Sequence, residues 1–351
     1  VVQVRRLRGG AGRASPAPYL PEGGSVRPID RRTFLAAGAW LLVVPHAAGA
    51  QAAQGVHRIG FVSPTGPGPR NEALLRGLRE LGYVEGRNVA VAMRFAEGRP
   101  ERLPGLVDEL IRLGVDVLVV GSTIGARAAK AATTTLPVVF AGSSDPVAGN
   151  IVKTLARPGG NLTGTSLAYG DGIAGKWLEL LVEMAHAVSP CSVLWSSSNT
   201  AGARFFEALR AAARKLDVRL DPHHATNAGE LDDALVAIRS SGARSLIVTP
   251  SPFWVANQRK LLRLAEDHRL PTMHFDEDFV GAGGLMSYGP SIAEAYRRAA
   301  THVDRILRGA NPGDLPVEQP TQFDLVVNAR TAKALGLTVT QSMLIRARVI
   351  E

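Results

Sequence analysis

Val115-Asp116-Val117-Leu118-Val119-Val120 is the stretch that decides the fold class. A short, continuous apolar run of this kind is typical of a strand that is buried on both faces of a parallel sheet. A helical pattern follows it at residues 122–133, and a further apolar strand is expected at residues 137–141. Strands that alternate with helices predict an α/β fold with right-handed crossovers.

The same alternation extends in both directions from this strand. Upstream, strands are expected at residues 58–63 and 88–95, with helical patterns at 71–81 and 102–113. Downstream the order begins again, with strands at 192–195, 218–220, 245–248 and 271–275 and helices at 201–216, 230–240 and 257–268. A long helix at 291–308, a strand at 322–327 and a short helix at 329–337 come last. Two similar half-chains predict two α/β lobes with a ligand cleft between them.

A chain that crosses more than twice between the lobes would explain the elements that follow both half-chains. We expect residues 51–163 to form the first lobe and residues 164–288 the second. Residues 289–318 are expected to return to the first lobe, and residues 319–351 to the second. Small residues, Gly and Pro separate elements of the two lobes in the expected crossing segments, at 161–166, 288–291 and 316–321.

Residues 1–50 have the character of an export signal with an upstream extension. Arg31-Arg32-Thr33-Phe34-Leu35 precedes an apolar run, and Ala48-Gly49-Ala50 ends the segment. A basic cluster, a short apolar run and a small-x-small tripeptide are typical of a cleavable secretory signal peptide. The apolar run is shorter than the roughly 20 residues that span a membrane. We expect a periplasmic protein whose mature form begins near Gln51; a buried apolar helix after a basic loop is the alternative.

The route of export stays open between two systems. The paired arginines resemble a twin-arginine signal, although Asp30 stands where Ser or Thr is usual and Ala36 where Lys is usual. The general secretory route is the alternative. Because the chain opens on Val rather than Met, we expect the true start to lie further along, near Val26.

The positive charge of the chain is concentrated in this leader. Of the formal net charge of +9, the first 32 residues contribute +5, from seven Arg against Glu22 and Asp30, which leaves +4 for the rest. The basic balance therefore gives little support to a nucleic-acid partner, and none is expected. The one cysteine, Cys191, cannot form an internal disulfide, and its place at the start of an apolar run predicts a core residue.

Polar side chains follow the predicted strands at their carboxyl ends, where open parallel sheets bind ligands. Most are small hydroxyls and turn formers with few strong bases, which suits hydrogen bonding to a small polar ligand better than covalent chemistry. The candidate ligand-binding residues are Ser63, Pro64, Ser122, Thr123, Ser143, Asp145, Ser197, Asn199, Thr249, Ser251, Asp276 and Tyr288. No catalytic residue, metal ligand or cofactor is expected.

Gly121-Ser122-Thr123-Ile124-Gly125 is the sharpest of these sites. It lies between a buried strand and a helix, so its backbone N–H groups are unpaired donors at the positive end of the helix dipole. We expect a cradle for a carboxylate, formed without any positive side chain. One alternative is a helix N-cap with no ligand. The other is a nucleophile elbow with Thr123 in the place of the serine, although no His is obviously placed to serve it.

Three other motifs have both a functional and a structural interpretation. Residues 66–71 follow the first strand like a dinucleotide-binding loop, but two prolines remove backbone donors that a pyrophosphate needs. His223 and His224 are expected in a Pro-containing loop, as a solvated turn rather than a metal site. The acidic run at 276–278 ends a strand, and one of its carboxylates either faces the cleft, where it could pair with an ammonium group, or faces solvent.

Several segments carry motifs that occur in the same order in one known family. They include Arg157-Pro158-Gly159-Gly160-Asn161-Leu162-Thr163-Gly164, Gly281-Ala282-Gly283-Gly284-Leu285-Met286-Ser287-Tyr288-Gly289-Pro290, and residues 78–88, 291–309 and 315–337. Together they resemble the substrate-binding proteins of ABC transporters of the tryptophan/tyrosine type. The resemblance implies a type I periplasmic binding fold, with two Rossmann-like lobes joined by three crossing segments.

The resemblance also implies a function. The protein is expected to be a monomeric, extracytoplasmic solute-binding protein of an ABC importer. It would capture a small polar ligand, such as an aromatic or other amino acid, by lobe closure and deliver it to a membrane permease. The carboxylate of an amino acid is expected at Ser122 and Thr123, its ammonium group near Asp145 or Asp276, and its side chain against Pro64, Phe253 or Tyr288.

Two other classes of function stay open at this point. A secreted two-domain α/β hydrolase would need a nucleophile served by a base. A sensory module would present the ligand-bound form to a membrane receptor instead of a permease. The aromatic pair Phe253 and Trp254 has a structural alternative too, as packing between a loop and the nearby helix.

Overall fold

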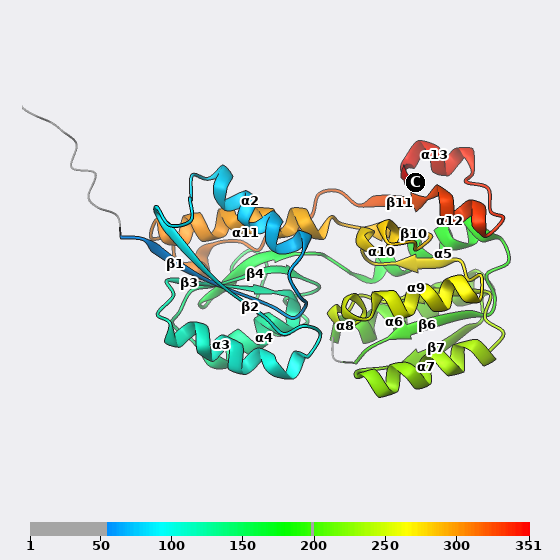
Figure 1. Cartoon of the computed structure of the whole chain (residues 1–351), viewed down its shortest axis with the longest axis horizontal. Coiled ribbons are helices and arrows are strands. Elements are labelled where there is room, and N and C mark those ends of the chain that lie inside the picture. The colour runs from blue at the N-terminus through cyan, green and yellow to red at the C-terminus, as the bar shows by residue number, and fades with distance from the viewer. Residues whose placement is uncertain (1–54, 198–199) are drawn as a thin grey trace, which may run out of the picture. The chain divides into compact units, whose positions relative to one another are not determined.

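The computed structural model describes residues 55–197 and 200–351 (Figure 1). The expected export signal and the expected start of the mature protein lie outside these residues. None of the helices in the described part of the chain is long and apolar enough to cross a membrane.

The first lobe is built on a parallel sheet of five strands. Its strand order is β2 (Val89–Phe95), β1 (His57–Ser63), β3 (Val117–Gly121), β4 (Val138–Ser143) and β5 (Leu162–Ser166). Every residue of β3 and β4 is buried, as their apolar sequences predict. Helices α2 (Pro69–Glu80) and α11 (Ile292–Leu307) cover one face of this sheet, and α3 (Leu103–Arg112) and α4 (Ser122–Ala132) cover the other (Figure 1). A short 3-10 turn, Pro100–Arg102, precedes α3.

The second lobe repeats this strand order and extends it. Its sheet runs β7 (Leu220–His224), β6 (Cys191–Trp195), β8 (Ser245–Val248), β9 (Thr272–His274) and β10 (Met286–Gly289), all parallel. Then β11 (Asp324–Asn328) pairs antiparallel with β10, and β12 (Ala347–Ile350) pairs parallel with β11. The helices of this part are α5 (Asp171–Ala185), α6 (Thr200–Lys215), α7 (Ala228–Ser240), α8 (Pro252–Ala256), α9 (Gln258–Asp267), α10 (Glu277–Gly281), α12 (Ala329–Ala334) and α13 (Gln341–Arg346). The predicted fold class, α/β with parallel sheets in two lobes, is confirmed.

Three stretches of chain connect the two sheets. The first leads from β5 to α5, the second from β10 to α11, and the third from a 3-10 turn (Pro312–Asp314) to β11. The first and third are hydrogen bonded to each other: Ser166 N donates to Glu318 O at 2.7 Å, and Glu318 N donates to Gly164 O at 3.0 Å. Gly164 has φ +148°, and a Cβ there would lie 2.0 Å from Phe140 O, so the position requires glycine.

One local prediction is wrong. The sequence predicts a strand at 218–220 and a loop with His223 and His224, whereas the structure has these histidines inside β7. The strand lies at the edge of the described sheet, so Pro222 can be accommodated without a backbone donor. The two imidazoles contact Ser192 and Ser197. Among the described residues no group of His, Cys, Asp or Glu could hold a metal ion.

Candidate ligand-binding site

The carboxyl ends of the two sheets enclose a cavity of about 30 Å³. Ser122 and Ser144 line it from the first lobe, after β3 and β4, and Ser251 and Phe275 line it from the second, after β8 and β9. A second cavity, of about 210 Å³, lies beside it and is lined by residues of the β1–α2 loop, by Val255 and Ala256 of α8 and by Asp278. Arg70 lines both cavities.

A buried ion pair joins the lobes at this place. Arg70 is the second residue of α2, and its Nη2 contacts Oδ2 of Asp276, the residue that caps α10. The two side chains are only 13% and 3% exposed. Burial, the largest single effect, lowers the pKa of Arg70, but Asp276, Tyr296 and Asp278 together raise it above its ordinary value. Arg70 therefore stays charged in a site from which water is largely excluded.

Two tyrosines complete the walls of the small cavity. Tyr169, in the first crossing, donates its hydroxyl hydrogen to Phe275 O at 2.6 Å. Tyr296 belongs to α11, and a Cβ at Gly121 would lie 2.5 Å from its hydroxyl, so the end of β3 must be glycine. Burial raises the pKa of both tyrosines, well above the ordinary value for Tyr169. Both hydroxyls are therefore neutral.

Ser122 has an unusual backbone at the cavity wall. Its φ is +63°, in the left-handed region, at the turn from β3 into α4. Its Oγ is buried and has no hydrogen-bond partner among the described residues, histidines included. The strained residue of the elbow-like motif is thus Ser122 and not Thr123, and no base serves it. The sequence predicts a carboxylate cradle without any positive side chain. In the structure Arg70 lines the same cavity as Ser122 and brings a positive charge to it.

Thr123 and Ser143 hold the first lobe together and do not line either cavity. Thr123 Oγ1 accepts a hydrogen bond from Ser144 N at 3.1 Å and lies 3.0 Å from Ser143 Oγ. On the neighbouring strand, Ser63 Oγ lies 3.0 Å from Thr65 Oγ1 and lines the larger cavity. Pro64, next to it, is buried.

Asp145 lies nearer the surface. Its Oδ1 accepts hydrogen bonds from Val147 N and Ala148 N, at 3.2 and 2.9 Å. Its Oδ2 lies 3.4 Å from Arg204 of α6, in a second ion pair between the lobes. Because Arg204 is 59% exposed, solvent screens this pair, unlike the pair of Arg70 with Asp276.

The remaining candidates lie in the second lobe. Ser251 caps α8, and Thr249 Oγ1 is buried without a partner among the described residues. Ser197 Oγ lies 2.8 Å from His224 Nε2, on the exposed side of the lobe, and Asn199 is outside the described residues. Tyr288 packs against Phe323, with ring centroids 6.1 Å apart, and lines neither cavity.

The acidic run and the aromatic pair take different roles. Asp276 faces the cleft, Glu277 pairs with Arg348, and Asp278 lies at the rim of the larger cavity. Partial burial and the charge of Asp276 raise the pKa of Asp278 to about 6. Trp254 is fully buried against Phe253, with ring centroids 5.0 Å apart, as in the packing interpretation.

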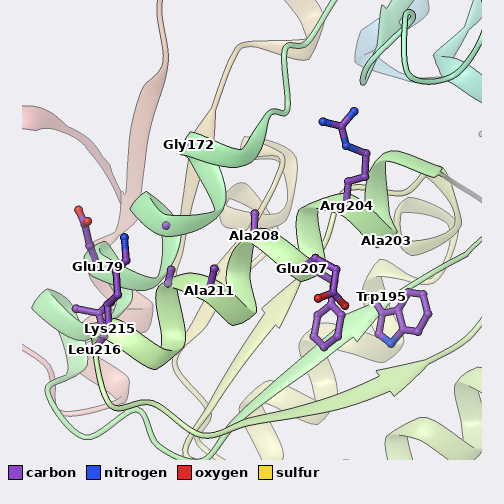
Figure 2. Close-up of a pocket in the computed structure, with 13 residues that line it drawn as sticks. Gly172, Glu179, Trp195, Ala203, Arg204, Glu207, Ala208, Ala211, Lys215 and Leu216 are labelled. Atoms are coloured by element: carbon purple, nitrogen blue, oxygen red, sulfur yellow. The ribbon is translucent and has the colours of Figure 1, made fainter.

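A larger hollow lies elsewhere in the second lobe, between α5 and α6, with a volume of about 770 Å³ (Figure 2). Figure 2 shows Trp195 and Glu207 at one end of this groove, Glu179 and Lys215 at the other, and alanines of α6 between them. Its charged side chains are exposed; that of Glu207 is 67% exposed. The groove lacks the buried opposite charges that distinguish the cleft.

The chain is similar to several known proteins, among them the following three. The tyrosine-binding protein of Clostridioides difficile (strain R20291) is 23% identical over 268 residues, 76% of each chain. The structure of an ABC domain in complex with L-Trp from Streptococcus pneumoniae has a TM-score of 0.77 and 24% identity, over 84% of this chain and 99% of that one. The ligand-free, open structure of a substrate binding protein with adhesive properties from Clostridium difficile has a TM-score of 0.61 and 22% identity, over 84% and 99%.

The model of one protein family spans nearly the whole described chain. The family is described as ABC transporter substrate binding protein, and the match covers residues 59–350, which includes both sheets and every residue of the cleft. The family and two of these relatives are described as substrate-binding or tyrosine-binding proteins, and the third was solved with L-Trp bound. The chain belongs to the ABC transporter substrate binding protein family.

Proposed function

We propose that the protein is the extracytoplasmic solute-binding component of an ABC importer, and that its ligand is an amino acid. The observation that carries the proposal is the buried meeting of Arg70 and Asp276, one charge from each lobe, at a cavity between the sheets. A ligand held there contacts both lobes at once, so its binding free energy drives lobe closure. The closed form is then the form that a membrane permease receives.

An aromatic amino acid is the favoured ligand class. The cavities between the lobes have aromatic walls, with Phe61 in the larger one and Tyr169, Phe275 and Tyr296 in the smaller. Such rings offer faces and edges to an aromatic side chain. Relatives named for tyrosine and solved with L-Trp support the same class.

The ligand is tested by calorimetry with the twenty amino acids and by mass spectrometry of solutes that co-purify with the protein. We expect an aromatic amino acid in both experiments. Small-angle scattering should show a more compact particle when that ligand is added, since closure brings the lobes together. If neutral solutes bind better than every amino acid, the ligand class is wrong; identical scattering profiles at saturation would argue against closure.

Export to the periplasm as a cleaved monomer is the second part of the proposal. It rests on the basic pair Arg31-Arg32, the apolar run after it and the tripeptide before Gln51. Replacing both arginines with lysine should leave the precursor in the cytoplasm. Unchanged export of that variant would favour the general secretory route, and an exported protein that retains residues 1–50 would contradict cleavage.

A further inference from the structure

The cleft is too full to take a ligand in the arrangement seen here. The two cavities have volumes of about 30 and 210 Å³, whereas pockets for small molecules usually enclose roughly 300 to 1,000 Å³. Arg70 lines both cavities, and its guanidinium is held there by Asp276. A ligand that fills both cavities at once must move Arg70, and this takes the pair apart.

Displacing the pair has a specific chemical consequence. Arg70 and Asp276 are both largely buried, and a buried charge that loses its partner is strongly destabilised. A ligand with only a carboxylate satisfies Arg70 and leaves Asp276 alone; a ligand with only an ammonium group does the reverse. Only a molecule that brings both charges, close together, replaces everything that the pair loses.

We infer that the ion pair of Arg70 and Asp276 is an internal substitute for the ligand, which a zwitterion takes apart by giving its carboxylate to Arg70 and its ammonium group to Asp276. The inference rests on the proposed function and deepens it, since it assigns the residues that read each charged end. In the arrangement seen here, the pair lies between the lobes, where a ligand would bind, and it competes with every ligand. It therefore rejects singly charged analogues more strongly than a cleft of neutral hydroxyls could.

The neighbouring groups agree with this assignment. Ser122 Oγ lines the cavity beside Arg70, is buried, and has no partner among the described residues, so it can donate to a carboxylate that Arg70 holds. On the other side, Asp278 adds a second acidic group near Asp276, which favours a cation there. The carboxylate and ammonium ends of the ligand thus meet sites that differ in sign.

The test measures three related probes by calorimetry: L-tyrosine, tyramine, which lacks the carboxylate, and 3-(4-hydroxyphenyl)propionate, which lacks the amine. The wild type should bind L-tyrosine far better than either analogue. Arg70→Gln should lose roughly 30-fold or more in affinity for L-tyrosine and also lose its preference over tyramine. Asp276→Asn should likewise lose the preference for L-tyrosine over 3-(4-hydroxyphenyl)propionate. Asn is also a good helix cap, so α10 keeps its start.

Two further variants make the result specific. Arg70→Lys keeps the charge and should retain part of the preference for L-tyrosine over tyramine. Arg210→Gln removes an arginine of α6 whose pair with Glu207 is exposed, and it should bind all three probes like the wild type. Circular dichroism of each variant confirms that it is folded.

The outcomes separate the inference from the proposed function. If the wild type binds L-tyrosine and both cleft variants keep its affinity and preferences, the inference is overturned while the binding function stands. If the wild type binds the analogues as well as L-tyrosine, or binds none of the three, the inference also fails. The proposed amino acid ligand fails on separate evidence, when neither the panel nor the co-purified solutes contain an amino acid that binds.

Discussion

The cleft between the sheets and the groove between α5 and α6 differ in both volume and charge. The groove encloses about 770 Å³ and the cleft cavity about 30 Å³. In the groove, Glu207 is 67% exposed, whereas Asp276 in the cleft is 3% exposed and faces an arginine of the other lobe. Water and salt screen the first kind of charge and not the second. Buried opposite charges from two lobes, rather than volume, are therefore the reason why the proposed ligand site is the cleft and not the groove.

Removing one carboxylate from each region gives the largest expected difference. Asp276→Asn leaves Arg70 buried without its counter-charge, and we expect a loss of about 3–5 kcal/mol in the free energy of unfolding. Glu207→Gln should change it by less than about 0.5 kcal/mol, since the side chain is exposed. Urea denaturation measures both. Equal losses in the free energy of unfolding would contradict the distinction between a buried charge in the cleft and an exposed charge in the groove.

The core of the second lobe behind the cleft should also respond to pH. His274, two residues before Asp276, is fully buried, and burial lowers its pKa to about 3. The unfolded chain binds a proton at this site below its ordinary pKa of 6.5, while the folded chain does not. Stability should therefore fall as the pH drops from 6.5 towards 3, by about 1.4 kcal/mol per pH unit from this group.

The contribution of His274 is isolated by comparing how steeply the free energy of unfolding changes with pH in the wild type and in a variant. His274→Phe keeps a ring to stack on Phe279, whose ring lies 4.6 Å from that of His274, and it removes the titration. Unfolding measured between pH 6.5 and 4 should be less steep in the variant than in the wild type. A variant with the same slope as the wild type would show that His274 does not take part.

Changes to glycine should have opposite signs in the two regions. Ser122→Gly relieves a left-handed backbone at the cleft wall and should stabilise the protein by about 1 kcal/mol. Ala203→Gly, in the groove-lining helix α6, should destabilise it by about 1 kcal/mol. Ser122→Gly should also weaken binding of the amino acid ligand by about 1 kcal/mol, because the hydroxyl donor of Ser122 is lost. Thermal melts with and without ligand measure these effects; destabilisation by Ser122→Gly would contradict the strain.

The exposed pair of Arg204 with Asp145 should matter least. It joins the lobes like the pair of Arg70 with Asp276, but its arginine is 59% exposed. Arg204→Gln is expected to change ligand affinity by less than about 0.5 kcal/mol, and by less still in high salt. A loss comparable to that of Arg70→Gln would show that exposure is a poor guide to which contact between the lobes recognises the ligand.

The fold class was predictable because the buried strands can be recognised in the sequence. Continuous apolar runs such as 117–120 are typical of strands buried inside a parallel sheet, and their alternation with helices leaves few topologies. The edge strand β7 was mistaken for a loop because it carries Pro222 and two histidines, which an edge tolerates and a central strand does not. Helix α5 has no counterpart in the expected elements, although its buried residues include Trp177, Leu178 and Leu181.

The site was predictable only in part, for a related reason. The strand-end rule names Ser122, Ser251 and Asp276, which lie at the cleft in the structure. It does not name Arg70, which lies 206 residues away from Asp276 in sequence and belongs to a helix. Its position in the first turn of α2, after the β1 loop, is the signal that was available. Tyr296 lies in the middle of α11, where no local pattern separates a cleft residue from a core residue.

The third crossing is anchored to the first lobe along most of its length. Thr163 Oγ1 donates to Leu315 O at 2.7 Å, His302 Nε2 lies 3.0 Å from Pro316 O, and Arg298 pairs with Glu318 at 2.6 Å. Only the few residues between Glu318 and the start of β11 are left to bend. A joint this short permits rotation about its own position and very little sliding, so the proposed closure would bring the two lobes together in the same register each time. Arg70 and Asp276 would then face each other in the same way each time, and no other structural element is needed to align them.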